Sequence, residues 1–196
     1  MNTNEQKTQM KKILIVDLEA TCDDGIKNYP KEKREIIEIG AVVADYEGKT
    51  YDEFSIFIKP VIIPTLSDFC TELTSITQEQ VDDALLMKDA FIIFNDFCSK
   101  VVKMHPELLG WGSWGYYDKG KFDYDVKNLN RTENFELSLL NLKHYNISDI
   151  YRIKNKLTRK AGLGKALSQQ GLKFVGTPHR GIDDVKNIAR LLPKTF

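Results

Sequence analysis

The chain has 196 residues, of which 42% are hydrophobic and 29% are charged. This composition is typical of a folded globular protein and excludes an intrinsically disordered one. The formal net charge is zero, which excludes a general attraction to polyanions. Any nucleic-acid site must therefore be a local basic patch.

The amino-terminal residues lack the features of a targeting segment. Residues 1–10 are polar, and no run approaches the roughly 18 apolar residues of a membrane span. We therefore expect a flexible tail over residues 1–11, a single domain over residues 12–196 and no membrane partner. The three cysteines are scattered and form no CxxC pair, so a reducing, cytoplasmic location is expected.

The order of strands and helices predicts an α/β fold with a mixed sheet. Apolar β-branched runs predict strands at 13–16, 35–44, 51–58 and 108–111. The turn at 45–49 joins the second and third strands as an antiparallel hairpin. Apolar residues at helical spacing predict helices at 88–102, 118–129, 163–170 and 181–192. Residues 135–142 are either a strand or irregular. Ser67 and Thr77 are typical helix N-caps, and Gln80 is a capping-box partner type for Thr77.

Two acids end the first predicted strand. Side chains alternate along a strand, so Asp17 and Glu19 leave it on the same face. Two like charges beside an apolar strand repel each other and are poorly solvated, and the usual compensation is a divalent cation with oxygen ligands. The alternative is that both carboxylates lie in a solvated loop after the strand. This stretch alone does not decide between the two.

Helix geometry separates the remaining acids. On the last predicted helix Asp183 lies opposite the apolar stripe and is expected to face water, whereas Asp184 borders the stripe and leans over the sheet. On the helix at 118–129, Asp118 lies one turn before the buried face. Asp123 is expected in solvent, and Asp125 is less clearly excluded. Two helices and one strand thus direct acids toward one place, although each position alone also fits ordinary helix-end chemistry.

One histidine lies near these acids in the sequence. His179 follows Pro178 in the loop before the last helix, five residues ahead of Asp184. Nearby acids favour the charged imidazole, and bound cations oppose this. A histidine in this position can accept a proton from water near neutral pH. His105 and His144 have no such neighbours and are expected to be surface or core residues.

The three acidic motifs, in this order, resemble those of a known enzyme superfamily. The segments are Asp-Leu-Glu-Ala-Thr at 17–21, Trp-Gly-Tyr-Tyr-Asp-Lys at 114–119 and His-Arg-Gly-Ile-Asp-Asp at 179–184. They resemble the motifs of the DEDDh, or DnaQ-like, 3′–5′ exonucleases. The segments at 17–22, 35–40, 66–77 and 179–190 resemble more closely the Eri-like and KapD-like exoribonuclease branch. The resemblance covers about residues 12–192, with Ser75 at a position where relatives often have glycine.

The resemblance implies a ribonuclease H-like fold and a metal centre. The implied sheet has five strands in the order 3-2-1-4-5, with the second strand antiparallel and helices on its faces. By analogy, Asp17, Glu19 and Asp184 bind one Mg²⁺ or Mn²⁺ ion. Asp17 shares a second ion that Asp118 supports, and His179 is the general base.

The resemblance also implies a substrate and the residues that bind it. The expected reaction releases 5′-nucleoside monophosphates from a free 3′ end, with RNA preferred. Leu18, Ala20 and Thr74 would contact the terminal nucleotide. Six basic residues without an intervening acid occupy a segment that could follow a phosphate backbone: Arg152, Lys154, Lys156, Arg159, Lys160 and Lys165. The alternative is that this run of charges is an ordinary solvent-exposed surface that binds no ligand. Four aromatic residues could stack on bases, although Trp111 is better placed in the core: Trp111, Trp114, Tyr116 and Tyr117.

Three hypotheses remain open at this stage. The first is a metal-dependent 3′–5′ exoribonuclease, and the second is a DNA-directed 3′–5′ exonuclease. The third is a regulatory module that uses an exonuclease-like domain to bind RNA or an unknown protein partner without cutting. A binding module has no need for five convergent ionisable groups, which favours an enzyme.

Overall fold

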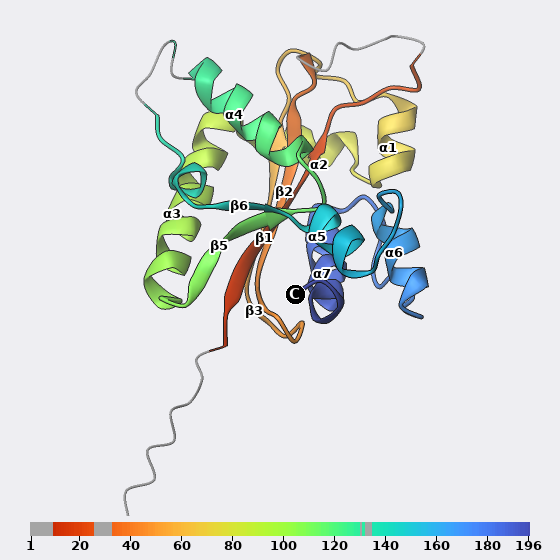
Figure 1. The fold of residues 1–196 in the computed structure, drawn as a ribbon. Coiled ribbons are helices and arrows are strands. Elements are labelled where there is room, and N and C mark those ends of the chain that lie inside the picture. Colours follow the sequence, from red (N-terminus) through yellow and green to blue (C-terminus); the bar gives the residue numbers. More distant parts are fainter. Residues whose placement is uncertain (1–9, 26–32, 130, 132–134) are drawn as a thin grey trace, which may run out of the picture.

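The computed structural model describes residues 10–25, 33–129, 131 and 135–196, and is built around one mixed sheet (Figure 1). Most of the predicted amino-terminal tail, residues 1–9, lies outside the described residues. The described part of the sheet has six strands: β1 (Lys12–Ala20), β2 (Ile36–Asp45), β3 (Thr50–Lys59), β4 (Leu85–Leu86), β5 (Leu108–Ser113) and β6 (His144–Asn146).

The strand order confirms the predicted topology and adds one short strand. The order is β4-β3-β2-β1-β5-β6. β2 is antiparallel to both β1 and β3, and β5 is parallel to β1 and β6. The five predicted strands correspond to β3-β2-β1-β5-β6. The sixth, β4, is a two-residue parallel addition beside the end of β3, too short to produce a periodic signal in the sequence.

Helices cover both faces of the sheet (Figure 1). Their bounds are α1 (Asp68–Thr74), α2 (Gln78–Asp82), α3 (Met87–Met104), α4 (Tyr117–Leu129), α5 (Ile147–Lys154), α6 (Leu163–Gln169) and α7 (Gly181–Leu191). Short 3₁₀ turns span Ser138–Asn141 and Leu192–Lys194. In the described part of the chain, no helix combines the length and the apolar character that crossing a membrane requires.

The alternation of β1 side chains divides the core into two layers. Leu14 and Val16 pack with the aromatic residues of α3 and α4, whereas Ile13 and Ile15 pack against the apolar stripe of α7. All four side chains are fully buried, which explains why this strand has no polar face. Asp17 has the same parity as Ile13 and Ile15, so it emerges on the α7 side of the sheet.

Two predicted helix starts are confirmed, and one special backbone position is explained. Ser67 accepts a hydrogen bond from the backbone N–H of Cys70, and Thr77 forms a complete capping box with Gln80. Ser75 ends α1 in the left-handed region with φ of 59°. Glycine adopts this conformation without a steric penalty, which is a physical reason for the glycine that the family resemblance implies at this position.

The segment after α4 settles an alternative that the sequence left open. Residues 135–142 are irregular and contain the 3₁₀ turn Ser138–Asn141, and the strand that pairs with β5 is β6, which was not predicted. The helix α5 was not predicted, and it contains the first part of the basic segment. Asn146 caps it by accepting a hydrogen bond from the backbone N–H of Asp149. One polar cap and two buried apolar residues, Ile147 and Tyr151, are too short a pattern to identify a helix.

The amino-terminal end of α7 lies in direct backbone contact with β2. A Cβ atom at Gly40 would overlap the backbone of Gly181 and Ile182, so only glycine permits this approach. Gly120, in α4, has no atom within 4 Å of the position that its Cβ would take.

We expect Gly40→Ala to lower the free energy of unfolding by about 3 kcal/mol or more, because the helix must move away from the sheet. Gly120→Ala is the matched control, and it should be neutral or stabilising by up to about 1 kcal/mol because alanine favours a helix. Urea unfolding of both variants measures the difference. Equal stability of the two variants would contradict the proposed close approach.

Candidate active site

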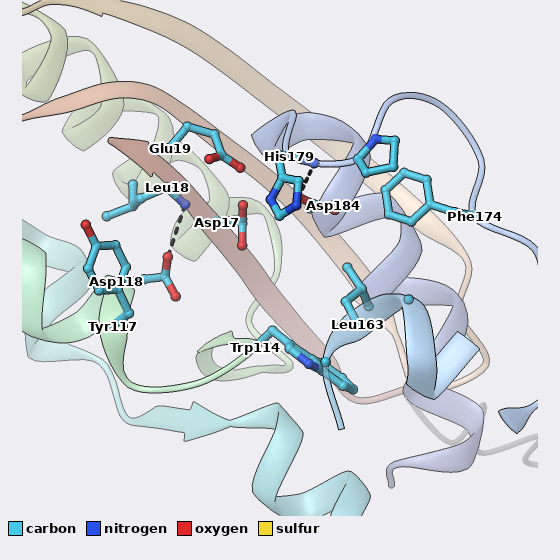
Figure 2. Close-up of a pocket in the computed structure, with 13 residues that line it drawn as sticks. Asp17, Leu18, Glu19, Trp114, Tyr117, Asp118, Leu163, Phe174, His179 and Asp184 are labelled. Carbon is cyan, nitrogen blue, oxygen red and sulfur yellow. Dashed lines mark hydrogen bonds between the residues drawn. The ribbon is translucent and has the colours of Figure 1, made fainter. Parts of the chain in front are cut away.

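A pocket of about 590 Å³ lies where β1, α4 and α7 converge (Figure 2). It contains all five of the ionisable residues predicted as catalytic. Its lining comprises Asp17, Leu18, Glu19, Trp114, Tyr117, Asp118, Gly162, Leu163, Gly164, Phe174, Pro178, His179 and Asp184.

Three elements supply the four carboxylates. Asp17 and Glu19 continue the α7-facing row of β1, as strand alternation predicts. Asp118 lies in the first turn of α4, and Asp184 lies in the first turn of α7. In Figure 2 Asp17 and Glu19 lie between Asp118 on one side and His179 with Asp184 on the other.

Asp118 is held by the backbone of β1. Its Oδ1 accepts a hydrogen bond of 3.1 Å from the backbone N–H of Leu18. The last paired residues of β1 and β5 are Ile15 and Gly112, so the Leu18 N–H lies beyond the reach of the β5 ladder and finds this carboxylate instead. The interaction determines the position of Asp118 relative to the strand acids. Of the other two acids on α4, Asp123 is half-exposed beside Lys119, and Asp125 is buried against Lys121 outside the pocket.

Burial raises the pKa of every carboxyl group in the pocket, and desolvation is the largest cause in each case. The pKa of Asp118 rises to about 6, that of Asp184 to about 7 and that of Glu19 to about 9. The pKa of Asp17 lies well above its usual range, with the neighbouring acids adding to the effect of burial. The metal-free pocket therefore retains protons at neutral pH.

The donor atoms fit a divalent cation. Ligand atoms of Glu19, His179 and Asp184 all lie within 4.8 Å of one another. Carboxylate oxygens are the ligands that Mg²⁺ and Mn²⁺ prefer. A cation would also offset the mutual repulsion that helps to raise the carboxyl pKa values, and its binding would release their protons.

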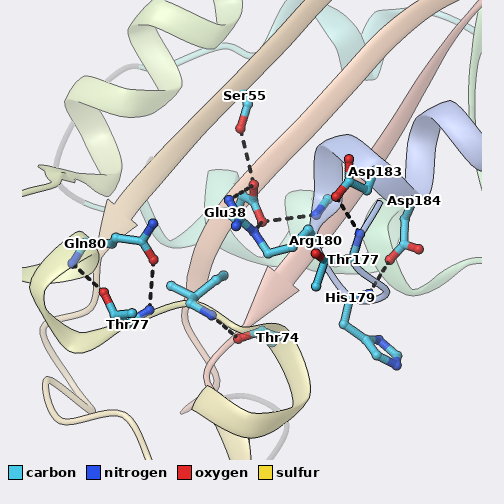
Figure 3. A network of polar contacts seen from close by, with 12 residues as sticks. Glu38, Ser55, Thr74, Thr77, Gln80, Thr177, His179, Arg180, Asp183 and Asp184 are labelled. Atoms are coloured by element: carbon cyan, nitrogen blue, oxygen red, sulfur yellow. Dashed lines mark hydrogen bonds and ion pairs between the residues drawn. The ribbon is translucent and has the colours of Figure 1, made fainter. Parts of the chain in front are cut away.

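The histidine lies on a loop in a constrained conformation. His179 has φ of 61°, in the left-handed region that few residues other than glycine adopt. Its backbone N–H donates a hydrogen bond of 3.1 Å to Oδ2 of Asp184, while its side chain is exposed at the pocket. The same carboxylate therefore faces the pocket and holds the loop that carries the imidazole (Figure 3).

The prediction for Asp183 requires a correction. Asp184 does face the strand acids, but Asp183 does not simply face water. It is half-buried, and its Oδ2 accepts a hydrogen bond of 2.8 Å from the backbone N–H of Thr177 (Figure 3). The carboxylate also packs against Gly176, which has φ of 88°. The helix-face argument placed the side chain correctly away from the pocket, but it could not foresee that the preceding loop folds back over that face.

Apolar and aromatic side chains complete the lining: Tyr117 lies beside Asp118, and Trp114, Leu163 and Phe174 lie farther from it (Figure 2). Trp114 and Tyr117 line it, whereas Tyr116 is exposed outside it and Trp111 is in the core, as predicted. The indole N–H of Trp114 donates a hydrogen bond of 3.0 Å to the carbonyl of Ala161. This contact holds the segment that brings Leu163 to the lining. The sequence did not identify Leu163, the first residue of α6, or Phe174 and Pro178 in the loop before α7 as lining residues, because isolated apolar residues resemble ordinary core residues.

Two predicted nucleotide contacts are not among the residues that line the pocket. Leu18 lines it, but Thr74 is fully buried at the end of α1. The Thr74 hydroxyl donates to the carbonyl of Cys70 and accepts from the N–H of Ile76. Ala20 ends β1 beyond the pocket. The prediction for these two residues has no support from the pocket geometry.

The predicted basic segment is partly neutralised within the fold. Asp149 forms ion pairs with Arg152 and Lys160, at 3.5 and 2.9 Å. Lys154 donates a hydrogen bond to the carbonyl of Phe196. Three residues of the segment form neither ion pairs nor side-chain hydrogen bonds with any described residue: Lys156, Arg159 and Lys165. Within this segment, these three cations have no described side-chain partner to exchange for a ligand.

The sequence profile of the Exonuclease (RNase_T) family matches residues 14–192. The chain belongs to this exonuclease family. It is 29% identical to the 3′-5′ exonuclease eri1 of Schizosaccharomyces pombe, over 98% of this chain and 70% of that protein. It is 34% identical to the 3′-5′ exoribonuclease 1 of Homo sapiens, over 91% of this chain and 50% of that protein.

A solved structure with the same fold supports this exonuclease assignment. It is the nuclease domain of 3′hExo, a DEDDh family member, bound to rAMP. The two chains are 32% identical with a TM-score of 0.72, and the match covers 94% of this chain and 90% of that one. The resemblance to Eri-type DEDDh exonucleases is therefore confirmed, as is the ribonuclease H-like architecture.

The raised carboxyl pKa values predict that the metal-free exonuclease becomes less stable as pH rises. The folded state binds more protons than the unfolded state, so the free energy of unfolding falls between about pH 4 and the folded values of about 6 to about 9. Glu19→Gln removes one such group. It should raise the melting temperature in EDTA at pH 8 but not at pH 4.

The expected change in melting temperature follows from the difference in proton binding between the folded and unfolded states. Each tenfold change in proton affinity corresponds to about 1.4 kcal/mol, or about 3–6 °C in a chain of this size. Added Mn²⁺ should stabilise wild type more at pH 8 than at pH 5 and should stabilise Glu19→Gln less. Asp123→Asn, at a half-exposed site outside the pocket, is the control. A wild-type melting temperature in EDTA that is constant from pH 4 to 9 contradicts the prediction.

Proposed function

We propose that this exonuclease removes 5′-nucleoside monophosphates from the 3′ end of RNA, using two divalent cations and His179 as the general base. The observation that carries the proposal is the convergence of four carboxylates and one imidazole in a single pocket with an apolar wall. The acidic side suits a cation-assisted attack on a phosphodiester. The aromatic and aliphatic side suits the base of the terminal nucleotide.

The carboxylates of the chain have the task of holding the cations. We infer that Asp17, Glu19 and Asp184 bind one Mg²⁺ or Mn²⁺ ion, and that Asp17 and Asp118 hold a second. When bound, the cations neutralise charge at the reacting phosphate and favour ionisation of the attacking water. Asp118 and Asp184 are aligned before any ion arrives, by the backbone N–H groups of Leu18 and His179 respectively.

His179 is suited to accept the proton of the attacking water. The imidazole is exposed at the pocket while its backbone is held by Asp184. One ring nitrogen comes within 4.8 Å of ligand atoms of both Glu19 and Asp184, so a water molecule between these groups is within its reach. A neutral imidazole takes the proton and passes it to solvent through the open side of the loop.

The preference for RNA rests on the relatives. The human relative is named an exoribonuclease, and the 3′hExo nuclease domain holds rAMP, a ribonucleotide. We propose that the exposed cations Lys156, Arg159 and Lys165 contact the phosphates upstream of the 3′ end, with Arg152, Lys154 and Lys160 contributing to the same basic surface. These side chains lie on or beside α5 and α6, and residues 162–164 between them line the pocket.

The direct test is digestion of 5′-labelled RNA and DNA, single- and double-stranded, by the purified chain. We expect stepwise shortening from the 3′ end, faster for RNA, that requires Mg²⁺ or Mn²⁺ and stops in EDTA. Faster digestion of DNA would transfer the proposal to a DNA exonuclease. Binding of RNA without cleavage under all metal conditions would identify a binding module instead.

His179→Ala should lower the rate by roughly 10²–10⁴-fold, the usual contribution of a positioned acid–base group. RNA affinity should be unchanged because the lost group acts on water. Calorimetric titration of Mn²⁺ into the variant separates a base from a ligand, since imidazole and carboxylates reach the same point. Metal affinity within a fewfold of wild type supports the base, and loss of the metal would instead make His179 a ligand. His105→Ala, outside the pocket, controls for general effects of removing a histidine.

Neutralising Lys156, Arg159 and Lys165 together should raise KM. It should also reduce the slope of log binding constant against log salt concentration by up to about three, about one for each lost phosphate contact. The value of kcat at saturating RNA should remain near that of wild type, because none of these residues lines the pocket. Neutralising Arg152 and Lys160, which already pair with Asp149, should have a smaller effect. A fall in kcat with an unchanged salt slope would place these residues in the chemistry rather than in binding.

A further inference from the structure

The acid Glu38 lies next to the catalytic pocket but does not line it. It is the third residue of β2, is fully buried, and is paired directly across the sheet with Glu19. Like charges at directly opposed positions of neighbouring strands destabilise a sheet. A buried carboxylate in this position requires a compensating partner.

That partner comes from the loop of the general base. Arg180 Nε donates to Glu38 Oε2 at 3.1 Å, and Arg180 Nη2 donates to Oε1 at 3.3 Å (Figure 3). The guanidinium also lies 5.0 Å above the ring of Phe57 on β3. Arg180 is the residue immediately after His179 and immediately before α7. The ion pair therefore links the sheet to the junction between the loop that carries His179 and the helix α7, which carries Asp184.

Glu38 also replaces a missing helix cap. Arg180 occupies the N-cap position of α7, and its side chain makes no capping hydrogen bond. The first N–H of the helix, that of Gly181, donates to Glu38 Oε2 at 3.0 Å. With a fourth hydrogen bond from Ser55, both carboxylate oxygens are fully used. A side chain on a neighbouring strand thus satisfies a helix terminus that its own sequence leaves open.

We propose that the Glu38–Arg180 pair is the positioning device of the active site, which holds His179 and Asp184 in register with the strand acids. This inference rests on the proposed function and assigns Glu38 and Arg180 no contact with substrate. The left-handed backbone of His179 persists only while its surroundings determine it. The Glu38–Arg180 pair holds the loop from the side of the sheet. The hydrogen bond that the Thr177 N–H donates to Asp183 holds it from the side of α7.

The test uses Glu38→Gln and Arg180→Gln, each of which breaks the two-bond ion pair. Glu38→Gln keeps the side-chain shape, and Arg180→Gln leaves a shorter, neutral polar side chain. The matched control is the exposed pair Lys186–Glu53, which joins α7 to the neighbouring strand β3 at 2.7 Å, through Lys186→Gln and Glu53→Gln. Both test variants should lose kcat by on the order of 10²-fold with KM for RNA within about twofold of wild type. The control variants should keep both values.

The second readout needs no activity. The chain has three histidines, so the imidazole ¹H–¹⁵N signals of His179 can be identified by their absence in His179→Ala. In the metal-free protein both test variants should move or broaden the His179 signals, while those of His105 and His144 stay in place. If wild type cuts neither RNA nor DNA, the proposed function fails. The His179 signals would still show whether the Glu38–Arg180 pair positions the imidazole.

The two variants also distinguish positioning from charge. Positioning predicts the same direction of change in both, because either substitution breaks the link. An electrostatic role predicts opposite directions: Glu38→Gln leaves an unpaired cation and weakens Mn²⁺ binding, and Arg180→Gln leaves an unpaired anion and tightens it. Opposite shifts in Mn²⁺ affinity with unmoved His179 signals would overturn the proposal. So would a lowered melting temperature with kcat and the His179 signals unchanged, which is the result expected of a purely structural pair.

Discussion

Four carboxylates share one poorly solvated pocket, and much of the surrounding structure can be understood as a response to their repulsion. Each is pushed toward its neutral form by burial. Without a cation they tend to hold protons, and our proposal is that a bound cation takes them as its ligands. The four acids stay close together because they are attached to regular strands and helices that hold them in place. A central strand buried on both faces carries two of them, and the first turns of two helices carry the others.

The pocket is divided into two chemically different sides, and this division suits a terminal nucleotide. The carboxylates and the imidazole occupy one side, where the phosphodiester would be attacked. Trp114, Leu163 and Phe174 occupy the other, which matches the apolar surface of a base. Leu163 comes from a segment that carries none of the pocket acids, and Trp114 holds that segment through Ala161. Substrate positioning and metal binding can therefore be altered by separate substitutions.

Periodicity in the sequence predicted most of the strands and helices and the faces of several acids, whereas the strand order and the roles of the pocket residues were implied by the resemblance to DEDDh exonucleases. The alternation at Asp17 and Glu19, and the helical phase of Asp184, are local properties of single elements, so the sequence predicts them well. The strand β6 and the helix α5 were missed because each is short and depends on packing against its neighbours. The role of Asp183 was missed for a related reason. Its hydrogen bond joins it to a loop, and no periodic pattern describes how a loop folds over a helix.

The motif at 35–40 gains a physical explanation from the contacts of its members. Glu35 accepts three backbone N–H groups, those of residues 61–63, and so ties the loop after β3 to the sheet. Glu38 and Gly40 have the same parity on β2, so both face α7. In the register of the sheet they lie opposite Glu19 and Asp17 respectively.

The contact with α7 places a different requirement on β2 at each of these two positions. Beside Glu38 the helix needs a hydrogen-bond acceptor for the Gly181 N–H and for Arg180. Beside Gly40 it needs empty space, because its backbone comes too close for any side chain. An acid followed two residues later by a glycine meets both requirements. The segments at 35–40 and 179–190, far apart in the sequence, are thus complementary halves of one contact. That contact sets the distance between the strand acids and the helix that carries Asp184.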